Sequence, residues 1–397
     1  MDDNAAAPLG VAMVGYAFMG AAHSHAWRTA PRFFDLPLSP EMRVLGGRDA
    51  VAVKAAAARL GWADTATSWA ELVHRDDVDL VDICTPGRTH AEIAIAALAA
   101  GKHVLCEKPL ANSVAEAEAM AQAAAEAATR GVRSMVGYTY RRVPAVQLAR
   151  QLVADGRIGT ARHVRVQYLQ DWLADPEVPL SWRLDKQLAG SGALGDIGSH
   201  AVDLAQFITG EHLTGVSAVL ETFVHERPVA GAFAGLSGSA DAAGGRGPVT
   251  VDDAAVFLAR LSGGGLGVFE ATRFAVGRKN AIRLEVNGSL GSLYFNFEDM
   301  NVLHFYDATE DAAVAGFRRI VVTEPQHAYV AHWWPAGHGL GYEHAFTHQV
   351  VDLVGAIAAG EQPTPSFADG LAVQRALDAV ERSAGDDSRW VAVERPD

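Results

Sequence analysis

The stretch Val104-Leu-Cys-Glu-Lys-Pro-Leu110 carries an apolar run directly into a charged pair and a proline. Pro109 ends the strand, because proline cannot donate a hydrogen bond to a sheet ladder. A lysine at the end of a buried strand is costly unless it has a role there, and open α/β sheets bind ligands at the carboxyl ends of their strands. The stretch therefore predicts a functional Lys108. The alternative is that Lys108 only extends its ammonium group to water.

A glycine turn follows the first expected strand, Leu9-Gly-Val-Ala-Met-Val-Gly15. The sequence Gly15-Tyr-Ala-Phe-Met-Gly20 matches the dinucleotide-binding fingerprint, with Ala17 in place of the second glycine. Gly15 permits the tight turn, Gly20 permits close packing of helix on strand, and the helix N-terminus would face the pyrophosphate. We therefore expect the nucleotide contacts to include Gly15, Ala17, Phe18, Met19 and Gly20.

The choice between NAD and NADP depends on the end of the second strand, which we expect at 42–46. An NAD site usually has an acidic residue there that binds the ribose 2′-hydroxyl, and here Gly47-Arg48-Asp49 follows the strand. Arg48 could bind a 2′-phosphate, which favours NADP, whereas Asp49 could still reach the ribose of NAD. Alternatively, Asp49 only caps a helix over 50–60. Both nucleotides stay open, with Gly47, Arg48 and Asp49 as candidate contacts.

Strands and helices alternate over residues 9–137, which predicts a parallel, doubly wound α/β domain over residues 1–137. Thr85 and Pro86 follow the strand at 78–84 and are expected to line the nicotinamide side, as are Glu107, Lys108 and Pro109. His90 begins the next helix. We interpret it as a first-turn residue and keep it among the candidate cofactor contacts.

Residues 138–397 predict a second domain of the α+β class with a large, mostly antiparallel open sheet. A helix at 145–155 precedes strands at 161–168, 216–224, 253–261, 266–272, 281–287, 291–297 and 318–322. The segment Pro228 to Pro248 is rich in Gly, Ala and Ser and predicts a mobile surface loop. Helices at 344–359 and 369–383 close the chain. An open sheet face favours a subunit partner, hence a homodimer or homotetramer.

Asp196 and His200 form a candidate acid–base pair where a helix is expected to begin. They stand four residues apart and therefore share one helix face. A carboxylate one turn from an imidazole raises its basicity and holds its ring, as a general base requires. The alternative is that the pair only supports the helix.

Composition excludes several classes of function. The 397 residues carry a net charge of −14, which argues against nucleic-acid and anionic-membrane partners. Two cysteines, Cys84 and Cys106, stand in apolar runs without a metal-ligand spacing, and the four histidines between 325 and 344 match no ligand pattern. We therefore expect no metal. The acidic start, Met1-Asp-Asp-Asn, lacks the basic region of a signal peptide, so a cytoplasmic location is expected.

Taken in order, the motifs resemble the Gfo/Idh/MocA oxidoreductases, the family of glucose–fructose oxidoreductase and inositol dehydrogenase. The resemblance extends from Gly15 to the closing segment 365–371. It rests on the glycine turn, Thr85-Pro86 with His90, Glu107-Lys108-Pro109, Gly137-Tyr138 with Arg141, and Asp196 with His200. It implies an N-terminal Rossmann domain that binds NAD or NADP, and a C-terminal sheet domain that commonly mediates dimers or tetramers. Ala17, Gly47 and Thr139, which stands where Asn is frequent, depart from the family pattern.

The resemblance also implies the chemistry: hydride transfer between a carbinol carbon of a sugar or cyclitol and the nicotinamide. The family's catalytic residues fall on Lys108, which would stabilise charge on the reacting oxygen, His200, which would take the hydroxyl proton, and Asp196, which would orient substrate or imidazole. Sugars have apolar ring faces and hydroxyl rims, so aromatic and polar side chains suit them. The further candidate substrate contacts are Tyr138, Trp172, Trp182 and Arg183, although such aromatics also serve as core.

Two rival functions remain. Some branches of the family keep NAD bound, oxidise a sugar transiently, eliminate a substituent and reduce the product again, so that they act as hydrolases or lyases. A non-enzymatic nucleotide sensor on the same fold is the second rival, and the joint presence of Lys108, Asp196 and His200 argues against it. The segment 325–344 resembles that of branches acting on levoglucosan or inositols, without separating them.

Overall fold

The computed structural model describes residues 6–234, 237–240 and 245–394, which form two compact units. The first unit contains the chain up to Thr139 together with Tyr342–Leu371, and the second contains Tyr140–Gly341 and the residues from Ala372 onward. We expected one boundary after residue 137, with both closing helices in the second domain. The helix at 342–359 instead packs with the first unit, because its apolar face completes the core there.

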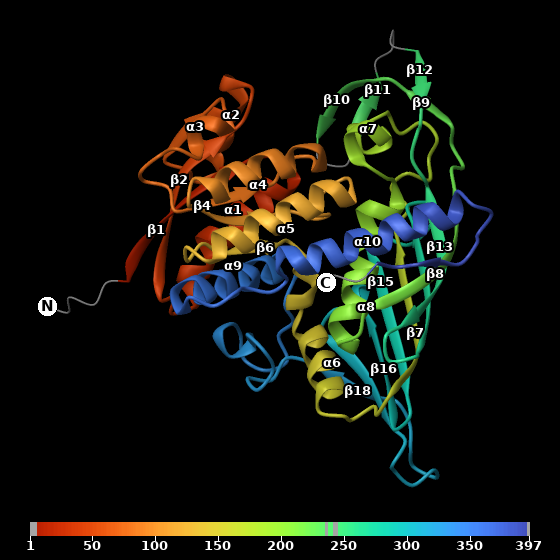
Figure 1. Cartoon of the computed structure of the whole chain (residues 1–397). Helices are drawn as coiled ribbons and strands as arrows, with labels where there is room; N and C mark the ends of the chain where they lie inside the picture. The colour runs from red at the N-terminus through yellow and green to blue at the C-terminus, as the bar shows by residue number, and fades with distance from the viewer. Residues whose placement is uncertain (1–5, 235–236, 241–244, 395–397) are drawn as a thin grey trace, which may run out of the picture. The chain divides into compact units, whose positions relative to one another are not determined.

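A parallel six-stranded sheet forms the centre of the first unit in the described part of the chain (Figure 1). Its strand order is β3-β2-β1-β4-β5-β6, which confirms the doubly wound α/β fold. The order reverses between β1 and β4, the place where such sheets bind ligands. The strands are β1 (Ala7–Val14), β2 (Leu38–Gly46), β3 (Asp64–Ala66), β4 (Leu80–Ile83), β5 (His103–Cys106) and β6 (Ser134–Val136).

Helices cover this sheet, and their ends follow the sequence signals closely. They are α1 (Phe18–Phe33), α2 (Ala50–Leu60), α3 (Trp69–Leu72), α4 (His90–Ala99), α5 (Val114–Ala128) and α9 (Tyr342–Ala359). Asp49 caps α2, since its carboxylate accepts the N–H groups of Val51 and Ala52. Ser113 caps α5, accepting the N–H of Glu116 and donating its hydroxyl to the Glu116 carboxylate.

The segment from Pro31 to Pro40, whose prolines favour an irregular connection, lies mostly in a helix and a strand. Helix α1 continues through Pro31 to Phe33, and β2 begins at Leu38. Pro31 is tolerated because it lies in the last turn, where α1 already buries Trp27 and Ala30 in the core. Three-residue β3 was not expected, because so short a strand leaves no periodic pattern.

The core of the first unit joins residues that are far apart in the sequence. Trp27 from α1 packs with apolar side chains of the central strands. Helix α9 adds the buried side chains of Phe346, Val350, Leu353 and Val354 to the same cluster. Burying side chains of this size stabilises a core by about 1.5–3 kcal/mol each, so α9 is an integral part of the first unit.

A nine-stranded sheet forms the centre of the second unit, again among the described residues (Figure 1). Its order is β18-β17-β16-β15-β7-β14-β13-β8-β19, and all neighbours are antiparallel except β7 and β14, which confirms the expected open sheet. The strands are β7 (Ala161–Leu169), β8 (Leu213–Glu221), β13 (Ala254–Leu261), β14 (Leu266–Thr272), β15 (Ala281–Gly288), β16 (Gly291–Asn296), β17 (Val302–Asp307), β18 (Arg318–Val321) and β19 (Val391–Ala392). Strands β17 and β19 were not expected.

Helices α6 (Pro144–Ala154) and α8 (Ser199–Thr209) lie along this sheet, and α10 (Phe367–Ala384) begins in the first unit and ends in the second. The expected loop from Pro228 to Pro248 contains short strands instead. They are β9 (Glu226–Pro228), β10 (Ala230–Ala234), β11 (Ser237–Ala240) and β12 (Arg246–Pro248), paired as β9 with β12 and β10 with β11. Residues 235–236 and 241–244 of that loop lie outside the described residues. Over the described ranges, no helix is both long and apolar enough to cross a membrane.

Candidate active site

The glycine turn between β1 and α1 has the geometry that a dinucleotide phosphate requires. Gly15 has a φ of +103°, and a Cβ there would lie 2.7 Å from the carbonyl oxygen of Cys84. A Cβ on Gly20 would lie 2.2 Å from the carbonyl oxygen of Gly15. Ala17 takes the N-cap position of α1 without a side-chain cap, and Phe18 and Met19 leave the first turn free of acidic groups. The exposed N–H dipoles therefore fit a pyrophosphate.

At the end of β2, the structure explains Gly47 and changes the role of Asp49. A Cβ on Gly47 would lie 2.0 Å from the ring of Tyr16, so any other residue there would have to displace that ring. The Asp49 carboxylate is bound to the first turn of α2, as the capping alternative predicted. Arg48 is exposed beside it. Tyr16, in the middle of the glycine turn, is a candidate contact for the nucleotide that sequence reasoning missed.

The ends of β4 and β5 are tied together by His90. Its two ring nitrogens lie 2.8 Å from the carbonyl oxygen of Thr85 and 3.0 Å from that of Pro109. Burial lowers the pKa of His90, and the hydrogen bonds to the two carbonyl groups act against that shift; the two contacts hold the loops after β4 and β5 together. Pro86 separates Thr85 from this helix start. Lys108 is half-buried two residues beyond the end of β5, at the carboxyl edge that the sequence predicted.

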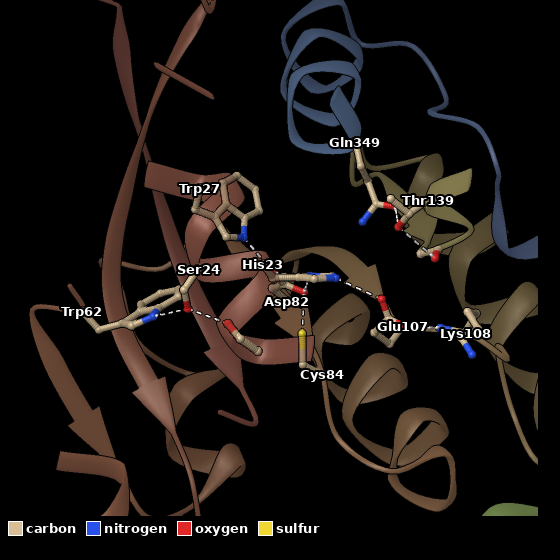
Figure 2. A network of polar contacts seen from close by, with 12 residues as sticks. His23, Ser24, Trp27, Trp62, Asp82, Cys84, Glu107, Lys108, Thr139 and Gln349 are labelled. Atoms are coloured by element: carbon tan, nitrogen blue, oxygen red, sulfur yellow. Dashed lines mark hydrogen bonds and ion pairs between the residues drawn. The ribbon is translucent and has the colours of Figure 1, made fainter. Parts of the chain in front are cut away.

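A buried histidine next to Glu107 was not predicted. Figure 2 shows His23 of α1 between the carboxylates of Asp82 and Glu107. Its Nδ1 lies 2.9 and 3.0 Å from the two carboxylate oxygens of Asp82, and its Nε2 lies 3.0 Å from Oε1 of Glu107. Burial acts to lower the pKa of His23, but the charge of Asp82 and the hydrogen bond to it prevail and hold this pKa well above the usual value. The signal in the sequence was Asp82, a charge inside an apolar strand, which needs a buried partner.

Tyr138 and Thr139 end the first unit. Both are buried, and the Thr139 hydroxyl donates to Oε1 of Gln349 in α9 at 2.9 Å. The polar group that departs from the family pattern at position 139 is therefore bound inside the unit. Tyr138 keeps a buried aromatic ring, as a core residue would.

In the second unit, His200 is enclosed by aromatic rings. The ring centroids of Tyr140 and Tyr168 lie 4.6 and 5.9 Å from that of His200. The two tyrosine hydroxyls are 2.7 Å apart, and the Tyr168 hydroxyl donates to Asn280 at 2.7 Å. His200 itself is buried at the start of α8. The two aromatic rings limit the rotation of the imidazole.

Helix α8 is anchored beneath His200 by a buried ion pair. Arg141 binds Asp203 through Nε, 3.0 Å from both carboxylate oxygens, and through Nη2, 2.6 Å from Oδ1. The guanidinium also stacks over Phe207, 4.9 Å from the ring centroid. Arg141, a member of the motif set, therefore holds the helix that carries His200.

Asp196 lies in a π-helical turn, Leu194–Gly198, that directly precedes α8. Such turns are frequent at functional sites. Oδ2 of Asp196 lies 3.6 Å from Nη1 of the fully buried Arg273. Burial lowers the pKa of Arg183 nearby, and the Asp196 charge opposes that shift. Asp196 is thus a carboxylate near two guanidinium groups.

The two candidate tryptophans belong to the same region of the second unit. The Trp172 indole donates to Gln170 at 2.9 Å, and the Arg273 guanidinium lies 5.7 Å from the Trp172 ring. Arg183 stacks on Trp182 at 4.5 Å. Arg273, a residue that sequence reasoning missed, contacts both Trp172 and Asp196. Arg183, stacked on Trp182, is close enough to Asp196 and Arg273 for their charges to affect its pKa. Lys108 belongs to the first unit and Asp196 with His200 to the second.

The comparisons with known proteins cover both units. A model of an oxidoreductase family with an NAD-binding Rossmann fold matches residues 9–138, and a model of the GFO/IDH/MocA C-terminal domain matches residues 146–294. The chain is 42% identical to levoglucosan dehydrogenase of Pseudarthrobacter phenanthrenivorans over 97% of this chain and 98% of that one. It is 27% identical to inositol 2-dehydrogenase of Rhizobium meliloti over 78% of this chain and 79% of that protein.

Solved structures are similar to this chain over nearly its whole length. An oxidoreductase domain protein from Kribbella flavida is 70% identical, with a TM-score of 0.93 over 98% of this chain and 100% of that chain. A levoglucosan dehydrogenase in complex with NADH and levoglucosan is 40% identical, with a TM-score of 0.91 over the same shares.

Proposed function

The chain belongs to the Gfo/Idh/MocA family of NAD-dependent sugar oxidoreductases, and we propose that it oxidises a secondary hydroxyl of an anhydrosugar of the levoglucosan type. The observation that carries the proposal is the similarity to levoglucosan dehydrogenase over nearly all of both chains, which includes the second unit as well as the nucleotide-binding one. Cyclitols are the second substrate class to test, because the similarity to inositol 2-dehydrogenase covers a smaller share.

In the proposed reaction the nicotinamide, when bound, supplies the hydride acceptor. The carbinol C–H bond breaks and its electron pair leaves with the hydrogen as hydride, while the C–O bond becomes a carbonyl. His200 takes the hydroxyl proton, and its neutral ring is the required starting state. Lys108 donates a hydrogen bond to the same oxygen and stabilises the negative charge that develops there. The products are a ketone, the reduced nucleotide and a protonated His200.

Two neighbouring groups support the proposed roles in the second unit. Asp196, held by Arg273, offers a carboxylate acceptor for a substrate hydroxyl or for the imidazole. Tyr140 and Tyr168 keep the His200 ring in place, and the Arg141–Asp203 pair keeps its helix in place. A sugar has apolar ring faces and polar hydroxyl groups. These could be contacted by the aromatic rings of Trp172 and Trp182 and by the guanidinium of Arg183.

We propose either NAD or NADP as the cofactor. NAD is supported by the levoglucosan dehydrogenase structure that holds NADH. NADP is supported by exposed Arg48 and by Asp49, whose carboxylate is bound to its own helix and therefore repels a 2′-phosphate less. The cofactor contacts we propose remain those of the glycine turn, the β2 end and the loops after β4 and β5.

We further propose that subunits pair through the outer face of the second unit's sheet. Val256 and Val219 are direct partners on β13 and β8, and the exposed apolar side chains of this face are Val219, Val256, Leu258 and Leu266. Such a patch favours a partner. Light scattering should therefore give at least twice the monomer mass, and Leu258→Glu should lower it. A monomeric wild type would contradict this.

The function is tested by absorbance at 340 nm, with NAD or NADP and a panel of anhydrosugars, cyclitols and free sugars. We expect reduced nucleotide with levoglucosan-type sugars, and a fall of about 10²–10³ in kcat for Lys108→Met with nucleotide binding retained. Retained turnover in Lys108→Met would remove its assigned role. Silence across the panel, with nucleotide co-purifying with the protein, would instead favour the hydrolase or lyase rival.

A further inference from the structure

His23 is held as a cation by two carboxylates inside the first unit. Its side chain is 1% exposed, and its two ring nitrogens face carboxylate oxygens at 2.9–3.0 Å. A carboxylate only accepts hydrogen bonds, so both nitrogens must carry hydrogen and the ring is an imidazolium. Charge-assisted bonds of this kind are roughly twice as strong as neutral ones.

The surroundings of His23 fit this charge assignment. Asp82 faces it from β4, Cys84 and Glu107 face it from the positions directly after β4 and β5, and the ring of Phe346 packs on it from α9 with centroids 5.5 Å apart. The Trp27 indole donates to the second oxygen of Asp82 at 2.7 Å. Burial raises the pKa of the Cys84 thiol, so Cys84 stays neutral. Ligand-type atoms of His23, Asp82 and Cys84 lie within 4.8 Å of one another, but both imidazole nitrogens are already used, which favours a hydrogen-bonded network over a metal site.

Glu107 transmits the position of His23 to the loop that carries Lys108. Oε1 of Glu107 accepts from His23, and Oε2 accepts the backbone N–H of Lys108 at 3.1 Å. Gly137 makes room for this conformation, because a Cβ there would lie 2.8 Å from Oε1 of Glu107. Both carboxylate oxygens are therefore fixed, one on α1 and the other at the carboxyl edge of the sheet.

We propose that His23 is a positioning residue for the dehydrogenase reaction: through Glu107 it fixes the peptide of Lys108, and through α1 it links that peptide to the phosphate-binding turn. His23 lies in the second turn of the helix whose N-terminus fits the pyrophosphate. The His23 side chain thus connects the phosphate-binding turn with the loop that carries Lys108. The proposal rests on the proposed function, because it assigns His23 a role in that reaction.

A double-mutant cycle tests the link. His23→Gln replaces the imidazolium with a neutral amide, whose single nitrogen can take the place of only one of the two ring nitrogens. Glu107→Gln replaces one acceptor oxygen with a donor and must lose one of its two bonds. We expect kcat to fall at least tenfold in each variant, with the double variant no slower than the slower single one, because both changes break one chain of contacts. The Kd for NADH should stay within threefold, because the phosphate contacts remain.

Ser24→Ala is the matched control. Ser24 is the next residue on α1, equally buried, and accepts the Trp62 indole N–H at 2.9 Å on the side away from Glu107 (Figure 2). The variant should lose stability but keep kcat within twofold. An equal fall in kcat for Ser24→Ala, an unchanged kcat for His23→Gln, or losses that multiply in the double variant would each overturn the proposal.

The emission of bound NADH separates this proposal from the proposed function. If the wild type oxidises no sugar, the function fails, but the nicotinamide emission can still be compared between variants. A changed emission in His23→Gln with an unchanged one in Ser24→Ala supports the positioning role, and an unchanged emission in both overturns it. Should His23→Gln not fold, Glu107→Gln carries the test, and an unchanged kcat and emission there overturn the proposal.

Discussion

Adding one methyl group at Gly137 should loosen the network around His23. An alanine Cβ would lie 2.8, 3.2 and 3.3 Å from Oε1, Cδ and Cα of Glu107, whereas ordinary contact begins at 3.4 Å. Oε1 must therefore retreat by about 0.6 Å, which lengthens its 3.0 Å contact with Nε2 of His23 to as much as about 3.6 Å. The lost charge-assisted hydrogen bond costs about 1.5–3 kcal/mol. Alanine also lowers the conformational entropy of the unfolded chain relative to glycine, which offsets this loss of stability by about 0.4–1 kcal/mol.

The net expectation is that Gly137→Ala destabilises the first unit by about 1–2 kcal/mol. With a urea m-value of about 2 kcal/mol/M, the unfolding midpoint should fall by about 0.5–1 M. Gly355→Ala is the matched control, because Gly355 lies inside α9 and a Cβ there meets nothing within 4 Å. Its unfolding midpoint should stay or rise. In a Glu107→Ala background the cost of Gly137→Ala should vanish. Equal midpoints for Gly137→Ala and Gly355→Ala would refute the reasoning.

Three further predictions follow from separate features of the structure. Arg48→Ala should lower kcat/KM with NADP by about tenfold, or about 1.4 kcal/mol, and leave NAD within twofold; an equal loss with both nucleotides in the 340 nm assay would exclude a 2′-phosphate role. Arg141→Met leaves Asp203 buried without its main partner and should cost about 3–5 kcal/mol in thermal or urea unfolding, with at least half recovered by adding Asp203→Asn. The raised pKa of His23 implies that its ionised ring stabilises the fold fully below pH 6.5 and that this contribution is lost as pH rises through the raised value. The stability advantage of the wild type over His23→Gln should therefore shrink with increasing pH in urea titrations, and an advantage that grows would contradict the charge assignment.

Local signals predicted the elements well where a residue acts on its neighbours. Asp49 and Ser113 cap the helices that their positions indicated, and Lys108 lies beyond the end of a buried strand as Pro109 required. The errors occurred where tertiary burial overrides a local preference. Burial of the apolar face of α1 keeps the helix going through Pro31. Strand β17 is held in the sheet by its hydrogen bonds to β16 and β18, which its own sequence does not indicate.

The candidate site was predictable in its motifs and not in its connections. His23 lies 59 residues from Asp82 and 84 from Glu107, so no spacing rule relates them. Arg273 and Tyr16 were missed for a similar reason, because each acquires its role only through a contact with a distant residue, Asp196 or Gly47. A charged residue inside an apolar strand, as at Asp82, is the sequence signal that would have prompted a search for a buried partner.

The place of α9 in the first core has a consequence for synthesis on the ribosome. About 200 residues separate Thr139 from Tyr342, where α9 begins. At about 5–20 residues per second, the nascent chain waits about 10–40 s for the helix that covers Trp27 and its neighbours. During that interval the apolar surface that will contact Phe346 and Leu353 is open to chaperones or to aggregation. A fragment that ends at residue 139 should share this exposure permanently.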